Sequence, residues 1–146
     1  MTNLEVQDLF ALGTSVFACT RGGVFVTTDQ GKSWEPRNNG LLDTDVYTIV
    51  MNDSVLCCGT SGGVYASRDG GLSWFKEGLS TPVTCLIAVG SELLANAAFG
   101  SADGTYLSDD NGSTWEQVTS GTRVFALAAS GAALIEAQSG GIFFSK

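Results

Sequence analysis

An eight-residue phrase that occurs three times constrains the fold of this chain more than any other feature. The copies read TTDQGKSW from Thr27, SRDGGLSW from Ser67 and SDDNGSTW from Ser108, and they start 40 and then 41 residues apart. Their common pattern is S/T-x-D-x-G-x-S/T-W. A period of about 40 to 45 residues with β-rich flanks is the length of a four-stranded propeller blade, so the pattern predicts an all-β repeat protein.

The residue types in the phrase predict a turn that is locked by its own side chains. An aspartate two residues before a glycine can accept backbone N–H bonds within its turn, while the glycine takes a positive φ. The Ser or Thr at the start can add a hydroxyl bond, and the Trp can cover the turn at the start of the next strand. A catalytic or Ca²⁺-binding role for the aspartates is the alternative, but the turn explains Asp, Gly and hydroxyl together. The residues expected in this structural role are Thr27, Asp29, Gly31, Trp34, Ser67, Asp69, Gly71, Trp74, Ser108, Asp110, Gly112 and Trp115.

The phrase resembles the Asp-box, or bacterial neuraminidase repeat (BNR), of sialidases and many other β-propellers. This resemblance covers most of the chain, because the flanks of each box also repeat. It implies a sialidase-like fold of blades with four antiparallel strands, boxes on the rim of one face and binding sites on the opposite face. The repeated flanks are V-x-x-L from Val6, Val83 and Val124, and Gly-Gly-Val/Ile from Gly22, Gly62 and Gly140.

Aligned repeats predict a single domain over residues 1–146, with blades at about 5–44, 45–82, 83–121 and 122–146. The last copy reaches the first box position at Ser145 and lacks the Asp, Gly and Trp, which gives about 3.75 blades. Closed propellers take about four to eight blades, and an open arc leaves apolar faces uncovered. A homodimer that closes an eight-bladed ring satisfies twofold symmetry. A four-bladed monomer, and a designed or excised fragment without a ligand, remain alternatives.

Charge and hydropathy exclude several classes of partner. The chain has 7 Lys and Arg against 15 Asp and Glu, a net charge of −8, which argues against binding to nucleic acid. No apolar run approaches the roughly 18 residues of a membrane helix. The N-terminus lacks the basic segment of a secretory signal, so a cytoplasmic location is expected if the chain is complete.

No cofactor or metal is expected. Histidine is absent, and the four cysteines have no C-x-x-C spacing. Free cysteine behaves as a small buried hydrophobe. We therefore interpret Cys19, Cys57, Cys58 and Cys85 as core residues.

The residues favour a binding scaffold over an enzyme. No arginine motif of the sialidase type precedes the first box. Tyr47, Tyr65 and Tyr106 fall on predicted strands, and Tyr65 and Tyr106 each follow a glycine turn, where they are expected to pack within the blade. The leading hypothesis is a non-enzymatic propeller that binds a protein or carbohydrate through the face opposite the boxes. The repeats also resemble the photosystem II assembly factor family, which is a binding scaffold without catalysis. Candidate ligand-binding residues on that face are Arg21, Asn39, Asp43, Asp45, Asp103 and Arg123.

A glycoside hydrolase or lyase is the competing hypothesis. Such an enzyme needs two carboxylates about 5 to 10 Å apart across a cleft. The sequence offers Asp43 or Asp45 paired with Asp103.

Overall fold

The computed structural model describes residues 5–98, 102–121, 124–130, 133–138 and 140–145, and these residues form four antiparallel sheets without a helix. In each sheet the strands follow one another in chain order. The first two sheets contain β1 (Val6–Leu12), β2 (Ser15–Thr20), β3 (Gly23–Thr27) and β4 (Glu35–Pro36), then β5 (Val46–Asn52), β6 (Val55–Thr60), β7 (Gly63–Ser67) and β8 (Phe75–Lys76). The last two contain β9 (Val83–Val89), β10 (Glu92–Ala97), β11 (Gly104–Ser108) and β12 (Glu116–Gln117), then β13 (Val124–Ser130), β14 (Ala133–Gln138) and β15 (Gly141–Ser145).

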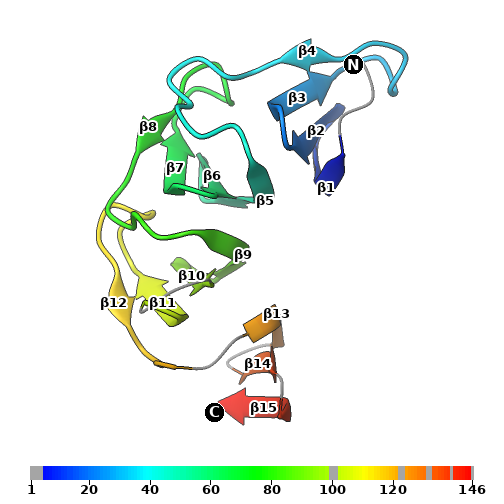
Figure 1. The fold of residues 1–146 in the computed structure, drawn as a ribbon. Helices are drawn as coiled ribbons and strands as arrows, with labels where there is room; N and C mark the ends of the chain where they lie inside the picture. Colours follow the sequence, from blue (N-terminus) through cyan, green and yellow to red (C-terminus); the bar gives the residue numbers. More distant parts are fainter. Residues whose placement is uncertain (1–4, 99–101, 122–123, 131–132, 139, 146) are drawn as a thin grey trace.

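The sheets follow one another along an open arc (Figure 1). Strands β1, β5, β9 and β13 lie on its concave side, and the short strands β4, β8 and β12 lie on its outer side. The first and fourth sheets stand at opposite ends, so the described chain does not close into a four-bladed ring. The predicted all-β fold of four-stranded antiparallel sheets is confirmed, with three strands in the fourth sheet.

The outer strands are shorter than the sequence predicts. We expected them to begin at the box tryptophan, but β8 begins at Phe75, one residue later. The backbone N–H of Trp74 donates to the carbonyl of Asn39 at 2.9 Å, in the segment between the first two sheets. The backbone N–H of Trp74 therefore takes no part in the pairing of β8 with β7.

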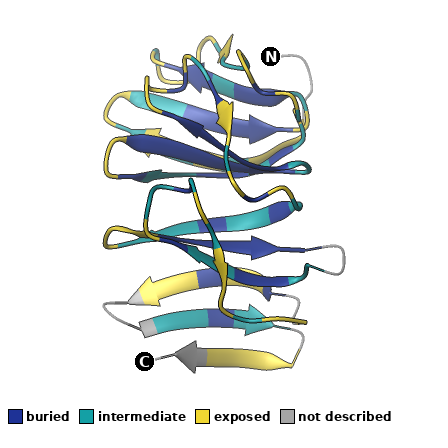
Figure 2. Ribbon diagram, turned by 90° about the vertical axis from the view of Figure 1, so that its left-hand side faces the viewer, coloured by how far each residue is buried: buried dark blue, intermediate teal, exposed yellow. Residues whose placement is uncertain are grey.

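Apolar side chains from neighbouring sheets interlock to form the core. Between the first two sheets, Phe17 and Val24 meet Ile49, Leu56 and Trp74, and all five are buried. Equivalent clusters join the second sheet to the third and the third to the fourth. Figure 2 shows this burial concentrated in the middle of the stack, whereas the fourth sheet is largely exposed. The described residues include no helix long and apolar enough to cross a membrane.

The cysteines pack as core residues. Cys19, Cys57 and Cys58 are buried, Cys85 is half-buried, and all four thiols are free. Burial raises the pKa of the Cys57 thiol to about 12 and also raises the pKa of the other three. These thiols therefore stay protonated at neutral pH, which makes them poor nucleophiles.

Replacing Trp74 with Ala should lower the free energy of unfolding by about 3 to 5 kcal/mol, because a buried aromatic side chain is lost and a cavity remains. Trp74 is 2% exposed, whereas its neighbour Phe75 is 60% exposed. The matched control Phe75→Ala should cost less than about 1 kcal/mol. Urea unfolding followed by circular dichroism measures both, and equal losses would contradict the packing described for Trp74.

Candidate functional site

The turns lie on two opposite faces of the arc. On one face, here called the box face, the β5–β6 turn meets the third sheet, where the Asn52 side-chain amide donates to the Ser91 carbonyl at 3.0 Å and to Asn111 Oδ1 at 3.1 Å. On the other, the loop face, the β6–β7 turn meets the segment before β5, where Ser61 N–H donates to the Asp45 carbonyl at 3.0 Å. All three boxes lie on the box face, because each joins the third strand of its sheet to the fourth.

Each box is held by hydrogen bonds that converge on one carboxylate. In the second box, Ser67 Oγ donates to Asp69 Oδ1 at 2.7 Å, and Ser73 N–H donates to the same oxygen at 2.9 Å. Gly71 N–H donates to Ser67 Oγ at 2.8 Å, and its φ is 86°. The first and third boxes repeat these bonds through Thr27, Asp29, Gly31, Ser33, Ser108, Asp110, Gly112 and Thr114.

These hydrogen bonds stabilise the ionised carboxylates. The hydroxyl of Ser33, then its backbone N–H and the hydroxyl of Thr27, lower the pKa of Asp29 from 3.8 to about 2. Ser73 and Ser67 lower the pKa of Asp69 to about 2 in the same way, and Thr114 leads the lowering for Asp110. Within the described residues, no group of three or more His, Cys, Asp or Glu side chains is placed to hold a metal ion.

Five residues on the loop face, Arg21, Asp43, Asp45, Tyr47 and Tyr65, form what we call the loop-face cluster. The Tyr65 hydroxyl donates to Asp43 Oδ2 at 2.9 Å, and the Tyr47 hydroxyl donates to Asp45 Oδ2 at 3.1 Å. The positive charge of Arg21 also acts on the Tyr47 hydroxyl and partly offsets the rise in its pKa. The cluster thus combines two carboxylates, two phenols and one cation.

The electrostatics of the loop-face cluster favour hydrogen bonding over nucleophilic chemistry. Burial, followed by the bond to Asp45, raises the pKa of Tyr47, and burial with the bond to Asp43 raises that of Tyr65. Both phenols therefore stay protonated at neutral pH. Asp45 Oδ1 is buried and has no hydrogen-bond partner among the described residues, which leaves one acceptor unsatisfied.

A β-bulge interrupts the innermost strand of every sheet at the same position. The register shifts between Val6 and Asp8 in the first sheet, and at the equivalent point in the other three. Bulges often lie beside binding sites, because they re-aim a side chain. The bulge positions lie where each innermost strand leaves the loop face, and their residues are Gln7, Tyr47, Thr84 and Phe125.

Three of the predicted ligand-binding residues make bonds outside the loop-face cluster, and one of these, Arg21, also belongs to that cluster. Arg21 also pairs with Glu5 at 3.0 Å, and both side chains are exposed. Asn39 contributes its backbone carbonyl to Trp74. Asp103 lies before β11 in the third sheet, where its carbonyl accepts from Gly121 N–H at 3.0 Å. Arg123 lies outside the described residues.

The sequence did not predict that Tyr47 and Tyr65 bond to Asp45 and Asp43, and Tyr65 was expected only to pack within its blade. One signal was available, because the segment between β4 and β5 covers residues 37–45, whereas the next two links cover 77–82 and 118–123. The extra length carries Asp43 toward the Tyr65 hydroxyl and Gly62, which lacks a side chain that would collide with the carboxylate.

Comparison with known sequences identifies one repeat. The family model described as BNR/Asp-box repeat matches residues 25–36, which contain the first box. No curated protein sequence matches the chain.

Solved structures share the fold over nearly the whole chain. An ancestral GH74 enzyme has a TM-score of 0.80 at 18% identity, covering 96% of this chain and 22% of that one. The extracellular domain of the one component system BT4673 from B. thetaiotaomicron has a TM-score of 0.79 at 13% identity, with coverages of 97% and 21%. The computationally designed Ika4 protein has a TM-score of 0.76 at 14% identity, with coverages of 99% and 92%. This chain spans about a fifth of the first two proteins, and identities this low show the fold alone.

Replacing Asp69 with Asn should cost stability at neutral pH, and the cost should shrink in acid. The folded pKa of Asp69, about 2, lies below its ordinary value of 3.8, so its stabilising contribution is complete above about pH 5 and is lost as the pH falls from about 4 to about 2. Thermal unfolding at pH 7, 4, 3 and 2 measures the difference from the unmodified chain. The control Leu72→Ala, at an exposed residue of the same turn, should show a difference that does not change with pH. A cost for Asp69→Asn that persists undiminished at pH 2 would contradict this account.

Proposed function

Since this chain is a β-propeller protein with BNR/Asp-box repeats, we propose that it is a non-enzymatic scaffold that binds a carbohydrate or protein ligand on the loop face. The aligned bulges are the observation that carries this proposal. They bring four different side chains, Gln7, Tyr47, Thr84 and Phe125, to the same level of the innermost strands, although the residue before each of them is always valine. These four side chains differ although the strands around them repeat, and this difference supports a role in ligand recognition rather than in packing.

A carbohydrate fits the chemistry of this face better than a protein does. Sugars present many hydroxyl groups, and the half-buried carboxylates of Asp43 and Asp45 can accept from them. Aromatic rings such as Phe125, which is 59% exposed, offer an apolar surface to the face of a sugar ring. The side-chain amide of Gln7 and the guanidinium of Arg21 add hydrogen-bond donors.

Hydrolysis is the weaker candidate. The carboxylates of Asp43 and Asp45 each accept a hydrogen bond from a tyrosine, and this ties them to their own sheet. Asp103 stands in the third sheet, and its carbonyl bonds within the same loop. The fold likeness to a GH74 enzyme does not transfer an activity, because the identity is 18%.

We also propose that a second copy completes the propeller. Each residue of the first sheet has an equivalent in the second sheet 40 positions later in the chain. The face of the first sheet that points away from the second sheet therefore corresponds to a face that is buried in the second sheet. Leu9 is 61% exposed, whereas its equivalent Ile49 is 4% exposed. Trp34 is half-buried, whereas its equivalent Trp74 is buried.

The other end of the arc presents the complementary face. Ile142 in the fourth sheet is 65% exposed, while its equivalents Val24 and Val64 are fully buried against the next sheet. The first sheet of one copy can therefore pack on the fourth sheet of the other in the way that neighbouring sheets pack within the chain. Twofold symmetry gives two such junctions and a closed ring.

Replacing Asp45 with Asn should weaken glycan binding at least about tenfold, because the amide loses the negative charge that strengthens hydrogen bonds from sugar hydroxyls. A glycan array identifies ligands, and calorimetry with the best of them measures the effect. Asp53→Asn on the box face is the matched control and should bind normally. Equal affinities for both variants would contradict the proposed site, and release of reducing ends from a bound glycan would favour the hydrolase.

Light scattering should give twice the 15.2 kDa mass of the chain. Leu9→Asp should dissociate the dimer, with a Kd at least about tenfold weaker, because a carboxylate would be buried in an apolar junction. Leu72→Asp is the matched control, because Leu72 is an exposed leucine outside both end faces. A monomeric unmodified chain at about 100 μM, well above a micromolar Kd, would contradict the ring.

A further inference from the structure

The link between the first two sheets carries an exposed Asn–Gly pair. Leu41 N–H donates to the Asn38 carbonyl at 3.0 Å, which closes a turn with Asn39 and Gly40 at its centre. Gly40 has a φ of 82°, the positive value that the third residue of a type II turn adopts. Both Asn39 and Gly40 are exposed. The pair therefore lies at the tip of a surface turn.

The contact of this turn with the second box fixes the glycine and frees its nitrogen. A Cβ at position 40 would collide with the carbonyl oxygen of Trp74. The Asn39 carbonyl accepts from Trp74 N–H at 2.9 Å, and the C=O and N–H of a trans peptide point in opposite directions. The Gly40 N–H therefore points away from Trp74. Within the part of the chain that the structure describes, neither this N–H nor the Asn39 side chain forms a hydrogen bond.

A second Asn–Gly pair, Asn111 and Gly112, lies in the turn of the third box. Asn111 Oδ1 accepts from the side-chain amide of Asn52 at 3.1 Å. Gly112 is buried, and its N–H donates to Ser108 Oγ at 2.9 Å. The same dipeptide is thus exposed at one place in this chain and held by hydrogen bonds at another.

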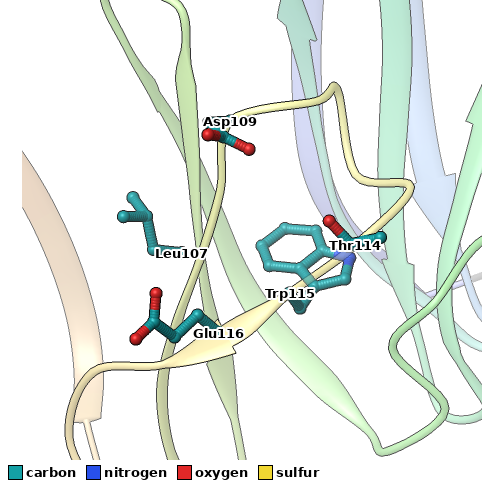
Figure 3. A pocket seen from close by; sticks show the side chains of 5 residues that line it. All are labelled: Leu107, Asp109, Thr114, Trp115 and Glu116. Atoms are coloured by element: carbon teal, nitrogen blue, oxygen red, sulfur yellow. The ribbon is translucent and has the colours of Figure 1, made fainter.

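The ring of Trp115 also holds the second pair. Figure 3 shows the turn between Asp109 and Thr114, which carries the pair, arching over this ring. The indole N–H donates to the Gly112 carbonyl at 2.7 Å. Gly112 is therefore bonded through both its N–H and its carbonyl, and the turn must open before the Gly112 nitrogen can react.

We propose that Asn39 is a site of spontaneous deamidation and that Asn111 is protected from it. The Gly40 nitrogen, deprotonated by hydroxide, forms a bond to Asn39 Cγ. The Cγ–Nδ2 bond breaks, and Nδ2 takes up a proton and leaves as ammonia, so that a cyclic succinimide remains. Glycine favours this step, because it has no Cβ to obstruct the attack. Water then opens the ring at one of its two carbonyl carbons and gives aspartate or isoaspartate, without oxidation or reduction.

Either product adds a negative charge to the link, and isoaspartate also changes its backbone. In isoaspartate the chain runs through the former side chain of Asn39, so the link gains one backbone carbon. That carbon enters the peptide unit whose carbonyl accepts from Trp74 N–H. Isoaspartate formation should therefore weaken the attachment of the link to the second box.

Incubation of the folded full chain at mildly alkaline pH, followed by tryptic peptide mapping, tests the proposal. Asn39 falls in the peptide of residues 38–68 and Asn111 in that of residues 77–123, so fragment masses locate each conversion from amide to acid. Asn39 should convert at least about tenfold faster than Asn111, because hydrogen bonds must break before Gly112 can react. The chain unfolded in guanidinium chloride is the control, and there both asparagines should convert at similar rates. Similar rates in the folded chain, or a slower Asn39, would overturn the proposal.

The variant Asn39→Gln tests the consequence for the link. Glutamine keeps the amide but would have to form a larger, less favourable ring, so conversion at this position should stop. The melting temperature of the unmodified chain should fall during incubation in step with its isoaspartate content, whereas that of the variant should stay constant. An equal fall in both chains would show that the loss of stability has another origin and would overturn the role given to isoaspartate.

The variant Ser108→Ala tests the protection of Asn111. It removes the acceptor of the Gly112 N–H, so conversion at Asn111 should become severalfold faster while the rate at Asn39 stays unchanged. Circular dichroism confirms that the variant is folded. An unchanged rate at Asn111 in the folded variant would overturn the explanation of its protection.

Discussion

The rest of the structure depends on the hydrogen bond that each box aspartate accepts from the backbone four residues later. In the second box, the bond from Ser73 N–H to Asp69 places the next residue, Trp74, at a fixed point outside the turn. The Trp74 backbone then donates to Asn39, and its indole donates to the Arg37 carbonyl at 2.8 Å. The turn that Asp69 stabilises is thereby attached to the link between the first two sheets.

The same contact between a link and the following box explains why some positions of the links must be glycine. Gly40 has a φ of 82°, and a Cβ at this position would collide with the carbonyl oxygen of Trp74. At the next junction, a Cβ on Gly78 would lie 2.5 Å from the Ser113 carbonyl oxygen. The links between sheets therefore approach the following box backbone to backbone, and this close approach lets each tryptophan fill the space between sheets.

The sequence was sufficient for those features that repeat. The boundaries of β1 and β9 agree with the repeated V-x-x-L segments that begin at Val6 and Val83, because equivalent residues of each repeat start the innermost strand. The loop-face cluster could not be predicted in the same way. Its bonds depend on the bulge at Tyr47 and on the path of the link that carries Asp43, and register and loop geometry leave little trace in residue type.

The junction between the third and fourth sheets shows how polar residues can set the order of similar sheets. Glu136 is 7% exposed and accepts hydrogen bonds from Thr105 Oγ1 at 2.8 Å and Gln138 Nε2 at 2.6 Å. The positions equivalent to Glu136 in the second and third sheets are Cys58 and Ala95, and Val64 stands where Thr105 does.

A buried carboxylate is costly unless it is hydrogen-bonded. Packed against the face of the second sheet, Glu136 would meet Val64, which offers no side-chain donor, so the fourth sheet fits the third better than any other sheet of this chain. Ala18 takes the position of Glu136 on the open face of the first sheet, and Ile142 takes that of Thr105 on the open face of the fourth. The junction within the chain is therefore marked by a polar pair, whereas the two faces left for a second copy are both apolar at this point. If the third sheet packed on the first sheet of another copy, or the Glu136 face of the fourth sheet packed on another fourth sheet, Glu136 would lose the hydroxyl of Thr105. The polar pair therefore disfavours both of these wrong pairings of sheets.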